Sequence, residues 1–183
     1  MGPAELIERY RSKGVLLDTN LLVLLTIGLY RRDRIASFKR TRQYTSDDFD
    51  LIAQLLGCFS RRVTTPNILT EVHNLTRQLP DREHNAVACV LARIVGEMFE
   101  VYVPSRIAST HARYGDLGLT DTITLVASSN PREFSVVAPA DPSEASLAES
   151  DEILVVTDNF SLWARLSQMG KAALNINHIR TLI

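Results

Sequence analysis

The sequence predicts an α/β fold, a three-layer α/β/α sandwich with a central, mostly parallel sheet of about five strands. Short apolar, β-branched runs alternate along the chain with longer segments of helical spacing. The short runs are continuously apolar rather than alternating, which is typical of parallel strands covered on both faces. Because 183 residues suffice for one substantial core, we expect a single domain spanning residues 1–183.

The expected elements follow from the spacing of apolar residues. The strands are the runs at 15–17, 63–65, 99–103, 153–157 and 173–175. The helices, with apolar residues every three or four positions, are expected at 21–29, 49–59, 66–79, 85–98, 121–128 and 160–169. Thr65 and Pro66 suit the cap and the first position of their helix, so that start is the best defined.

Two segments look like insertions into this core. Segment 130–151 holds Pro131, Pro139 and Pro142 among Ser, Ala and acidic residues, which predicts a long loop. Segment 31–48 has weak periodicity and an excess of basic residues over acids. Its basic residues considered for nucleic-acid binding are Arg31, Arg32, Arg34, Lys39, Arg40 and Arg42.

Composition excludes several classes of protein. With 45% hydrophobic and 22% charged residues, the chain resembles neither a disordered nor a fibrous protein. The longest apolar stretch, 15–30, contains Asp18 and is too short and too polar to cross a membrane. A formal net charge of −1 does not decide for or against nucleic acid, since clustered carboxylates can offset basic surface elsewhere.

Cellular location is inferred from the cysteines and the N-terminus. Cys58 and Cys89 lie alone in apolar, helix-like stretches, and we expect both to be reduced core residues. Glu5 and Glu8 interrupt an N-terminus that does not resemble a secretory signal. The expected compartment is therefore the cytoplasm.

Two aspartates directly follow predicted strands, Asp18 in VLLDTN and Asp158 in LVVTDN. Sites in parallel sheets lie at the carboxyl ends of the strands, so both side chains should project into one crevice. Each position also has a local interpretation, because Asp18, or either Asp158 or Asn159, could cap the helix that follows.

Two more acids belong to helices. Glu71, in TTPNILTEVHNL, lies past the first turn and cannot be a cap. Its neighbours Ile68 and Leu75 are apolar, so we expect Glu71 on the core-directed face, where a carboxylate needs a partner or a metal. Asp121, in GLTDTITLVAS, is expected to open a helix, where compensation of the helix dipole or capping by Thr120 are alternatives.

Together, the four acids Asp18, Glu71, Asp121 and Asp158 predict a metal site. Four carboxylates gathered at one end of a sheet repel one another and raise each other's pKa values. Mg²⁺ or Mn²⁺ would relieve this repulsion, because hard divalent cations prefer carboxylate and water oxygens.

The order of these motifs resembles the PIN-domain nuclease family: DTN after the first strand, a helical Glu, a later Asp opening a helix, and TD after another strand. The resemblance covers nearly the whole chain. It implies a PIN-like sandwich, one or two Mg²⁺ or Mn²⁺ ions, and phosphodiester hydrolysis in which Asp18, Glu71, Asp121 and Asp158 are the catalytic acids. Accompanying polar positions, expected to orient the acids or water, are Asn20, Thr157 and Asn159. Asp116 does not fit the motif and is interpreted as a loop or cap residue.

The predicted activity is that of a metal-dependent endoribonuclease. PIN-like proteins include toxins of toxin–antitoxin pairs, RNA-processing enzymes and DNA nucleases, and we favour a toxin or defence nuclease that cuts RNA. An antitoxin, another regulatory protein or a second copy of the chain are candidate partners. A catalytically silent PIN-like module that binds RNA or protein, and a PIN-like nuclease acting on DNA, remain alternatives. A phosphatase with Asp18 as nucleophile is disfavoured, because DTN lacks a second Asp two residues later.

The basic segment gives a hypothesis for substrate binding. Arginine forks suit phosphate oxygens, so the cluster between Arg31 and Arg42 is expected to contact RNA. Tyr30, Phe38 and Tyr44 are available for base stacking. The same segment could instead be a solvated surface or lie under a partner protein.

Overall fold

The computed structural model describes residues 2–139, 147 and 152–180. In this part of the chain, six strands form one sheet in the order β4-β3-β2-β1-β5-β6. Only β4 is antiparallel to its neighbour, β3, and the other pairs are parallel. The strands are β1 Val15–Leu17, β2 Arg62–Thr64, β3 Phe99–Tyr102, β4 Ser135–Val137, β5 Leu154–Thr157 and β6 Ala173–Asn175.

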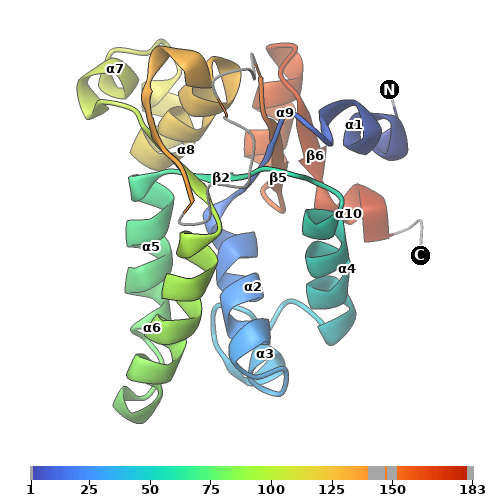
Figure 1. The fold of residues 1–183 in the computed structure, drawn as a ribbon, viewed down its shortest axis with the longest axis vertical. Helices are drawn as coiled ribbons and strands as arrows, with labels where there is room; N and C mark the ends of the chain where they lie inside the picture. Colours follow the sequence, from blue (N-terminus) through green and yellow to red (C-terminus); the bar gives the residue numbers. More distant parts are fainter. Residues whose placement is uncertain (1, 140–146, 148–151, 181–183) are drawn as a thin grey trace.

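Helices cover both faces of the sheet, which confirms the predicted three-layer α/β/α sandwich. In Figure 1, α2 (Thr19–Tyr30), α4 (Ser46–Gly57), α5 (Pro66–Thr76) and α6 (Asp81–Gly96) lie below the sheet. On the opposite face lie α8 (Tyr114–Ser129) and α9 (Phe160–Gln168). The shorter helices are α1 Pro3–Tyr10, α3 Arg34–Ser37, α7 Ser105–Ser109, the 3₁₀ turn η1 Pro131–Glu133 and α10 Ile176–Ile179.

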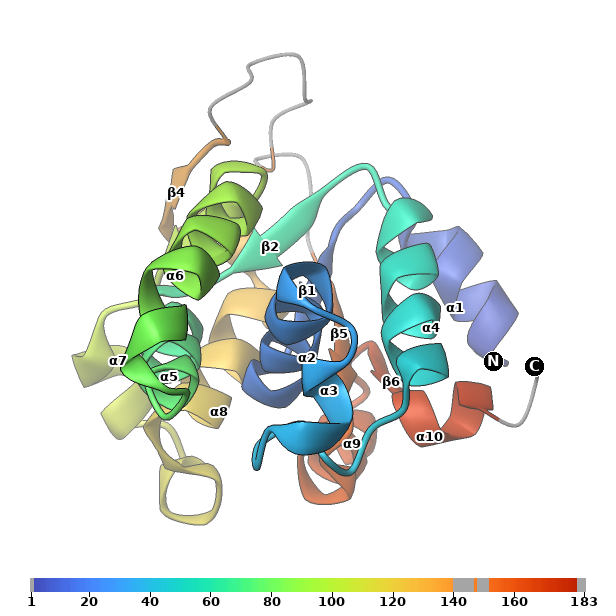
Figure 2. The same ribbon diagram turned by 90° about the horizontal axis from the view of Figure 1, so that it is seen from below.

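Helix α2 is the central element of its layer. Figure 2 shows it between the α5–α6 pair and α4, with which it is in contact. Residues 21–28 are all buried, which explains why this segment is apolar all round rather than amphipathic. Gly28 allows the close approach of α4, because a Cβ atom there would lie 2.1 Å from the Phe49 ring. This packing fixes where the N-terminus of α2, and hence Asp18, points.

The strand order places a topological switch point between β1 and β5. From β1 the chain builds the sheet outward through β2 and β3, and it then returns to the other side of β1 for β5 and β6. Leu17 at the end of β1 is in register with Val156 of β5. Ligand sites of open α/β sheets lie outside the carboxyl ends of the strands at such a point. Asp18 and Asp158 both follow these strands, as predicted.

The structure adds elements that the apolar spacing did not predict. The five expected strands are present within two residues of their predicted ends, but β4 lies in segment 130–151, which was expected to be a loop. Three residues with a half-exposed pattern carry little local signal, and it is pairing with β3 that makes them a strand. The rest of that expected loop, 140–146 and 148–151, lies outside the described residues.

Both cysteines are free, as expected for reduced thiols, but the prediction that they are core residues is wrong. Cys58 and Cys89 are both exposed, Cys58 at the end of α4 and Cys89 on α6. Both lie in apolar stretches, but each falls on the side of its helix that is turned away from the core. Across the described residues, no helix has the length and apolar character needed to cross a membrane.

Candidate active site

Asp18 is both a helix cap and the most buried acid of the candidate site. It follows β1 directly, and its side chain is 7% exposed. Oδ1 accepts a hydrogen bond from the Leu21 backbone N–H at 3.0 Å, which caps α2. Oδ2 accepts a hydrogen bond from the Thr157 hydroxyl, which comes from the end of β5. The capping interpretation is therefore correct, and it does not remove Asp18 from the site.

Asp158 is held on both oxygens by neutral donors. The Asn20 side-chain amide donates to Oδ1 at 3.1 Å. The Tyr44 hydroxyl donates to Oδ2 at 2.5 Å. Asp158 is half-buried and does not cap α9, because that position is taken by Asn159.

Glu71 lies at the crevice, but not in the core as predicted. Its neighbours Ile68 and Val72 are buried, whereas Glu71 itself is exposed. Thr19 donates a hydrogen bond to Oε2 at 2.8 Å, and the Thr120 hydroxyl donates to Oε1. The prediction was wrong because apolar neighbours on a helix do not fix the side on which an intervening residue projects.

Asp121 lies near the start of a helix, as predicted. Helix α8 runs from Tyr114 to Ser129, but its backbone is not helical at Gly118, where φ is 75°, so two helices meet at this kink. Asp121 follows this kink and is half-buried, and Thr120 hydrogen-bonds Glu71 instead of capping α8. A left-handed φ is readily adopted only by glycine, so Gly118 sets the direction in which the second part of α8 presents Asp121.

The four acids are linked electrostatically. The pKa of Asp18 is raised to about 7, mainly by burial and also by the negative charges of Asp158 and Asp121, although hydrogen bonds from Thr157 and Leu21 oppose the shift. Burial and then the charge of Glu71 raise the pKa of Asp121 to about 6. The interactions thus run from Asp158 through Asp18 and Asp121 to Glu71.

The donor set suits a hard cation. Within the described residues, no ion pair to Lys, Arg or His is recorded for Asp18, Glu71, Asp121 or Asp158, and their side-chain hydrogen bonds come from hydroxyl and amide donors. Such uncompensated carboxylates attract Mg²⁺ or Mn²⁺. In this part of the chain, however, no three acidic, His or Cys side chains are grouped closely enough to hold one metal ion. A cation here would bind to one or two carboxylates and keep several waters, as Mg²⁺ commonly does.

Comparisons with protein-family models, with curated proteins and with solved structures give no match for this chain. The resemblance to PIN-domain nucleases therefore rests on the order of its motifs, and the functional argument rests on the geometry of the site.

The three accompanying polar residues have different positions. Asn20 contacts Asp158, and Thr157 is fully buried and donates to Asp18. Asn159 contacts none of the four acids through its side chain, which caps α9 by accepting from Ser161 N at 2.9 Å. Its backbone N–H donates to the Thr157 hydroxyl at 2.9 Å, so it orients Thr157 rather than an acid.

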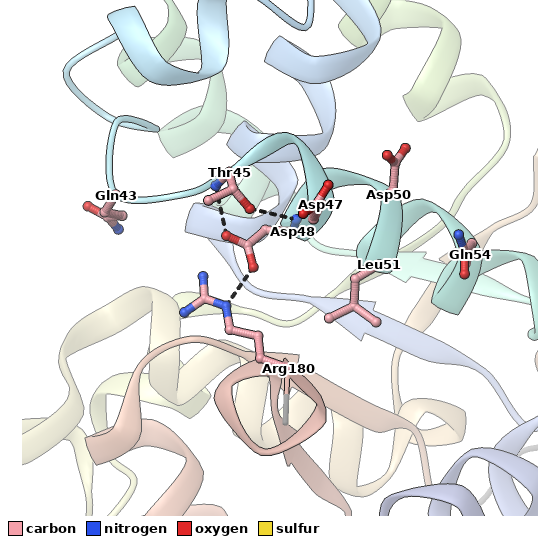
Figure 3. A pocket seen from close by; sticks show the side chains of 8 residues that line it. All are labelled: Gln43, Thr45, Asp47, Asp48, Asp50, Leu51, Gln54 and Arg180. Atoms are coloured by element: carbon pink, nitrogen blue, oxygen red, sulfur yellow. Dashed lines mark hydrogen bonds and ion pairs between the residues drawn. The ribbon is translucent and has the colours of Figure 1, made fainter. Parts of the chain in front are cut away.

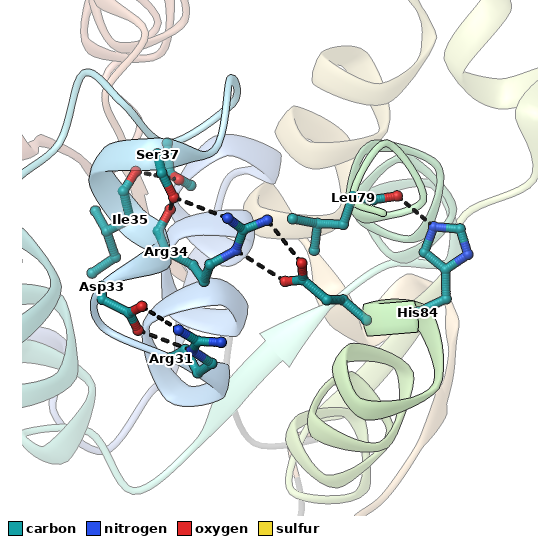
Figure 4. A network of polar contacts seen from close by, with 9 residues as sticks. Arg31, Asp33, Arg34, Ile35, Ser37, Leu79 and His84 are labelled. Atoms are coloured by element: carbon teal, nitrogen blue, oxygen red, sulfur yellow. Dashed lines mark hydrogen bonds and ion pairs between the residues drawn. The ribbon is translucent and has the colours of Figure 1, made fainter. Parts of the chain in front are cut away.

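The basic segment is largely committed to contacts within the chain. Arg31 pairs with Asp33 and Arg32 with Asp50. Arg34 makes two hydrogen bonds to Glu83 of α6, at 2.9 and 3.0 Å, and Figure 4 shows its guanidinium group in this network. Further along, Arg40 donates to Gln78 at 2.9 Å, while Lys39 and Arg42 are exposed. Contacts to α4, to the turn after α5 and to α6 hold the segment against these helices, although most of its basic side chains remain exposed.

Two of the three aromatic residues considered for stacking are buried. Phe38 and Tyr44 are each 4% exposed, so neither ring can stack on a base, and Tyr30 is half-buried. The exposed aromatic nearest in sequence to the site is Phe160, which is 64% exposed and follows Asn159. The ring centroid of Phe160 lies 5.2 Å from that of Trp163.

Sequence reasoning missed three contacts of the site. Thr19 and Thr120 are adjacent to Asp18 and Asp121 in the chain, and their place in the DTN and LTD triplets could have suggested a role. Tyr44 lies 114 positions from Asp158 in sequence, and no local pattern marks it. Asp116, as expected, lies outside the site, in the first turn of α8, and pairs with Arg165 at 2.9 Å.

Proposed function

We propose that this chain is a divalent-cation-dependent nuclease, an endoribonuclease acting through Asp18, Glu71, Asp121 and Asp158. The observation that carries the proposal is the electrostatic coupling of the four carboxylates at the switch point of the sheet, without a basic partner among the described residues. Structural ion pairs neutralise buried acids, whereas here the charges of Asp158 and Asp121 raise the pKa of Asp18, and that of Glu71 raises the pKa of Asp121. Perturbed carboxylates in a crevice are a mark of functional sites.

The residues divide into two groups in this mechanism. Asp18 and Asp158, at the ends of adjacent strands, would hold Mg²⁺ or Mn²⁺, while Thr157 and Asn20 orient their oxygens. When bound, the cation supplies charge neutralisation and an activated water for attack on phosphorus. Asp121 and Glu71 extend the acidic surface. With a pKa of about 7, Asp18 is partly protonated near neutral pH in the metal-free protein, whereas Asp121, with a pKa of about 6, is mostly ionised there, so cation binding would release a proton chiefly from Asp18.

Single-stranded RNA is the proposed substrate, and the biological role proposed is that of a toxin or defence nuclease in the cytoplasm. The motif order supports this role, and the exposed Phe160 ring near Asp158 offers a stacking surface for an unpaired base. An antitoxin or other regulatory protein, or a second copy of the chain, would be the partner.

A binding module without catalysis is the second candidate. It is favoured by one observation, the lack of three grouped ligand side chains among the described residues. Such a module would bind RNA or protein through the same crevice and would not respond to divalent cations.

Cleavage of labelled single-stranded RNA, structured RNA and DNA with Mn²⁺, Mg²⁺ or EDTA tests the proposal. Asp18→Asn and Asp121→Asn remove charge while keeping shape. Asp18→Asn, at a proposed cation ligand, is expected to lower kcat/KM by about 100-fold or more, and Asp121→Asn, which removes a supporting acid, by about 10–100-fold. Asp116→Asn is the matched control, because Asp116 is an exposed acid on the same helix as Asp121.

The outcomes separate the candidates. Cation-dependent RNA cleavage that is lost in both site variants and kept in Asp116→Asn supports the nuclease, whereas preferential cleavage of DNA would change the substrate class. A folded wild-type protein that cuts nothing, and whose Tm does not respond to Mn²⁺, would favour the binding module.

A further inference from the structure

Segment 31–48 reaches the candidate site through a single side chain, Tyr44. Its hydroxyl donates to Oδ2 of Asp158 at 2.5 Å, although the two residues are 114 positions apart. The ring is 4% exposed and therefore cannot contact a substrate base. Because the ring is buried and held in place, its hydroxyl donates one hydrogen bond in a defined direction.

The Tyr44 ring is held in place by the C-terminal part of the described chain. The guanidinium of Arg180 lies 5.9 Å from the ring centroid, at cation–π distance. Figure 3 shows Arg180 directed towards Asp48, whose Oδ1 accepts from Arg180 Nε at 2.6 Å. Asp48 is fixed in turn by the capping box at the start of α4, in which its Oδ2 accepts from Thr45 N at 2.8 Å. Tyr44 thus cannot move without disturbing α4 or the end of α10.

Each carboxylate oxygen of Asp158 accepts a hydrogen bond from a different side chain. Asn20, on the first turn of α2, holds Oδ1, while Tyr44 holds Oδ2. A carboxylate bonded in this way keeps one orientation, and loss of a side chain that supports a metal ligand commonly weakens metal affinity by about 10–100-fold. The pairing of Arg34 with Glu83 of α6 helps to hold segment 31–48 in place, and the Tyr44 hydroxyl provides its hydrogen bond to the four acids.

We propose that Tyr44 is a positioning residue that orients Asp158 for cation binding at the candidate site. The proposal rests on the proposed function and names a regulator of its metal affinity. It also assigns segment 31–48 a role in shaping the site, where the sequence suggested direct contact with RNA.

Binding of Mn²⁺ to the intact chain, measured by isothermal titration calorimetry, tests this role. Tyr44→Phe removes only the hydroxyl and keeps the ring beside Arg180, and it is expected to weaken Mn²⁺ binding by about 10–100-fold. The Mn²⁺ concentration for half-maximal RNA cleavage should rise by the same factor, while KM for RNA at saturating Mn²⁺ stays unchanged. Tyr102→Phe is the matched control, since Tyr102 is an exposed tyrosine that donates to Glu100 at 2.9 Å outside the site.

A second pair of variants decides the matter even if Tyr44→Phe does not fold. At position 44, p-aminophenylalanine keeps a donor in place of the phenol, and p-methylphenylalanine fills a similar volume without one. Tight Mn²⁺ binding by the first and weak binding by the second support the proposal. Equal Mn²⁺ affinities for the two overturn it.

The two proposals fail in distinguishable ways. A wild-type protein that binds Mn²⁺ and cuts RNA, with a Tyr44→Phe variant of equal Mn²⁺ affinity, overturns the role of Tyr44 alone. A wild-type protein that binds no Mn²⁺ overturns both the role of Tyr44 and the proposed function.

Discussion

Asp18 and Asp48 are alike in position but opposite in electrostatics. Each is a buried aspartate in the capping interactions of a helix, with 7% exposure for Asp18 and 6% for Asp48. Burial by itself acts to raise the pKa of both carboxyls. For Asp48 the hydrogen bond and charge of Arg180, with hydrogen bonds from Thr45, outweigh burial and leave the pKa below its usual value. For Asp18 the neighbouring charges are negative, and the pKa rises to about 7.

Neither the burial of an acid nor a large pocket beside it is therefore enough to identify the candidate site. The pocket beside Asp48, with a volume of about 760 Å³, is lined by residues whose principal acid is already paired with Arg180 (Figure 3). At Asp18, no basic side chain among the described residues compensates the neighbouring negative charges. A buried acid that is paired with a cationic side chain has a structural role, whereas uncompensated acids with raised pKa values are candidates for ligand binding.

The largest effect expected from this comparison is on the pH dependence of stability. The pKa of Asp18 is raised from 3.8 to about 7, so between these values the folded protein binds one more proton than the unfolded chain. Its stability in EDTA should therefore fall as pH rises from about 4 to about 7, by about 1.4 kcal/mol for each pKa unit. Asp18→Asn removes this titration, and its stability relative to wild type should increase over the same range.

Urea unfolding of both proteins at several pH values measures this difference. Subtracting the unfolding free energy of wild type from that of the variant cancels the contribution of titrating groups that the two proteins share. A difference that does not change between pH 4 and pH 8 would contradict the raised pKa, and addition of Mn²⁺ at pH 8 should stabilise wild type more than Asp18→Asn.

Replacing Asp48, the acid paired with Arg180, is expected to change the stability relative to wild type in the opposite direction as pH rises. Asp48→Ala leaves Arg180 without its carboxylate and removes the capping box of α4, at a cost of about 2–3 kcal/mol at pH 7 after allowance for the partial exposure of Arg180. Because its pKa is lowered, the stability contributed by Asp48 is present above its usual pKa and is lost as pH falls. Asp47→Ala, an exposed neighbour on the same helical turn, serves as the control in urea unfolding. Equal midpoints for the two variants would refute the importance of the pair.

The smallest effect is expected at an exposed ion pair. Arg31 and Asp33 are bonded to each other, but both side chains are more than half exposed. Solvent and salt screen such pairs, so Asp33→Ala should leave the urea midpoint unchanged within error. A clear loss of stability would mean that Asp33 helps to dock segment 31–48. Exposed acids would then contribute to stability as the buried, paired Asp48 does.

Local pattern was sufficient for the core of the fold. Continuous apolar runs gave the five parallel strands, because a strand buried on both faces has no polar alternation. The same pattern placed Asp18 and Asp158 at strand ends, and strand order then brought them together. The surroundings of Glu71 and the part of α8 before Gly118 could not be derived in this way, since Glu71 is hydrogen-bonded by threonines of two other helices and α8 is divided by the kink at Gly118.

Reading along the chain was enough to predict the α/β class, the central sheet and the places of the four acids after strands and within helices, because apolar periodicity and residue type are local properties. The donors around those acids follow only from the fold. It pairs Arg32 and Arg34 of segment 31–48 with acids of α4 and α6 and brings the Tyr44 hydroxyl to Asp158. Among the described residues, it also places a cation beside Asp48 and like charges beside Asp18. Electrostatic environment depends on distances between residues far apart in the chain, and no spacing along the sequence encodes those distances directly.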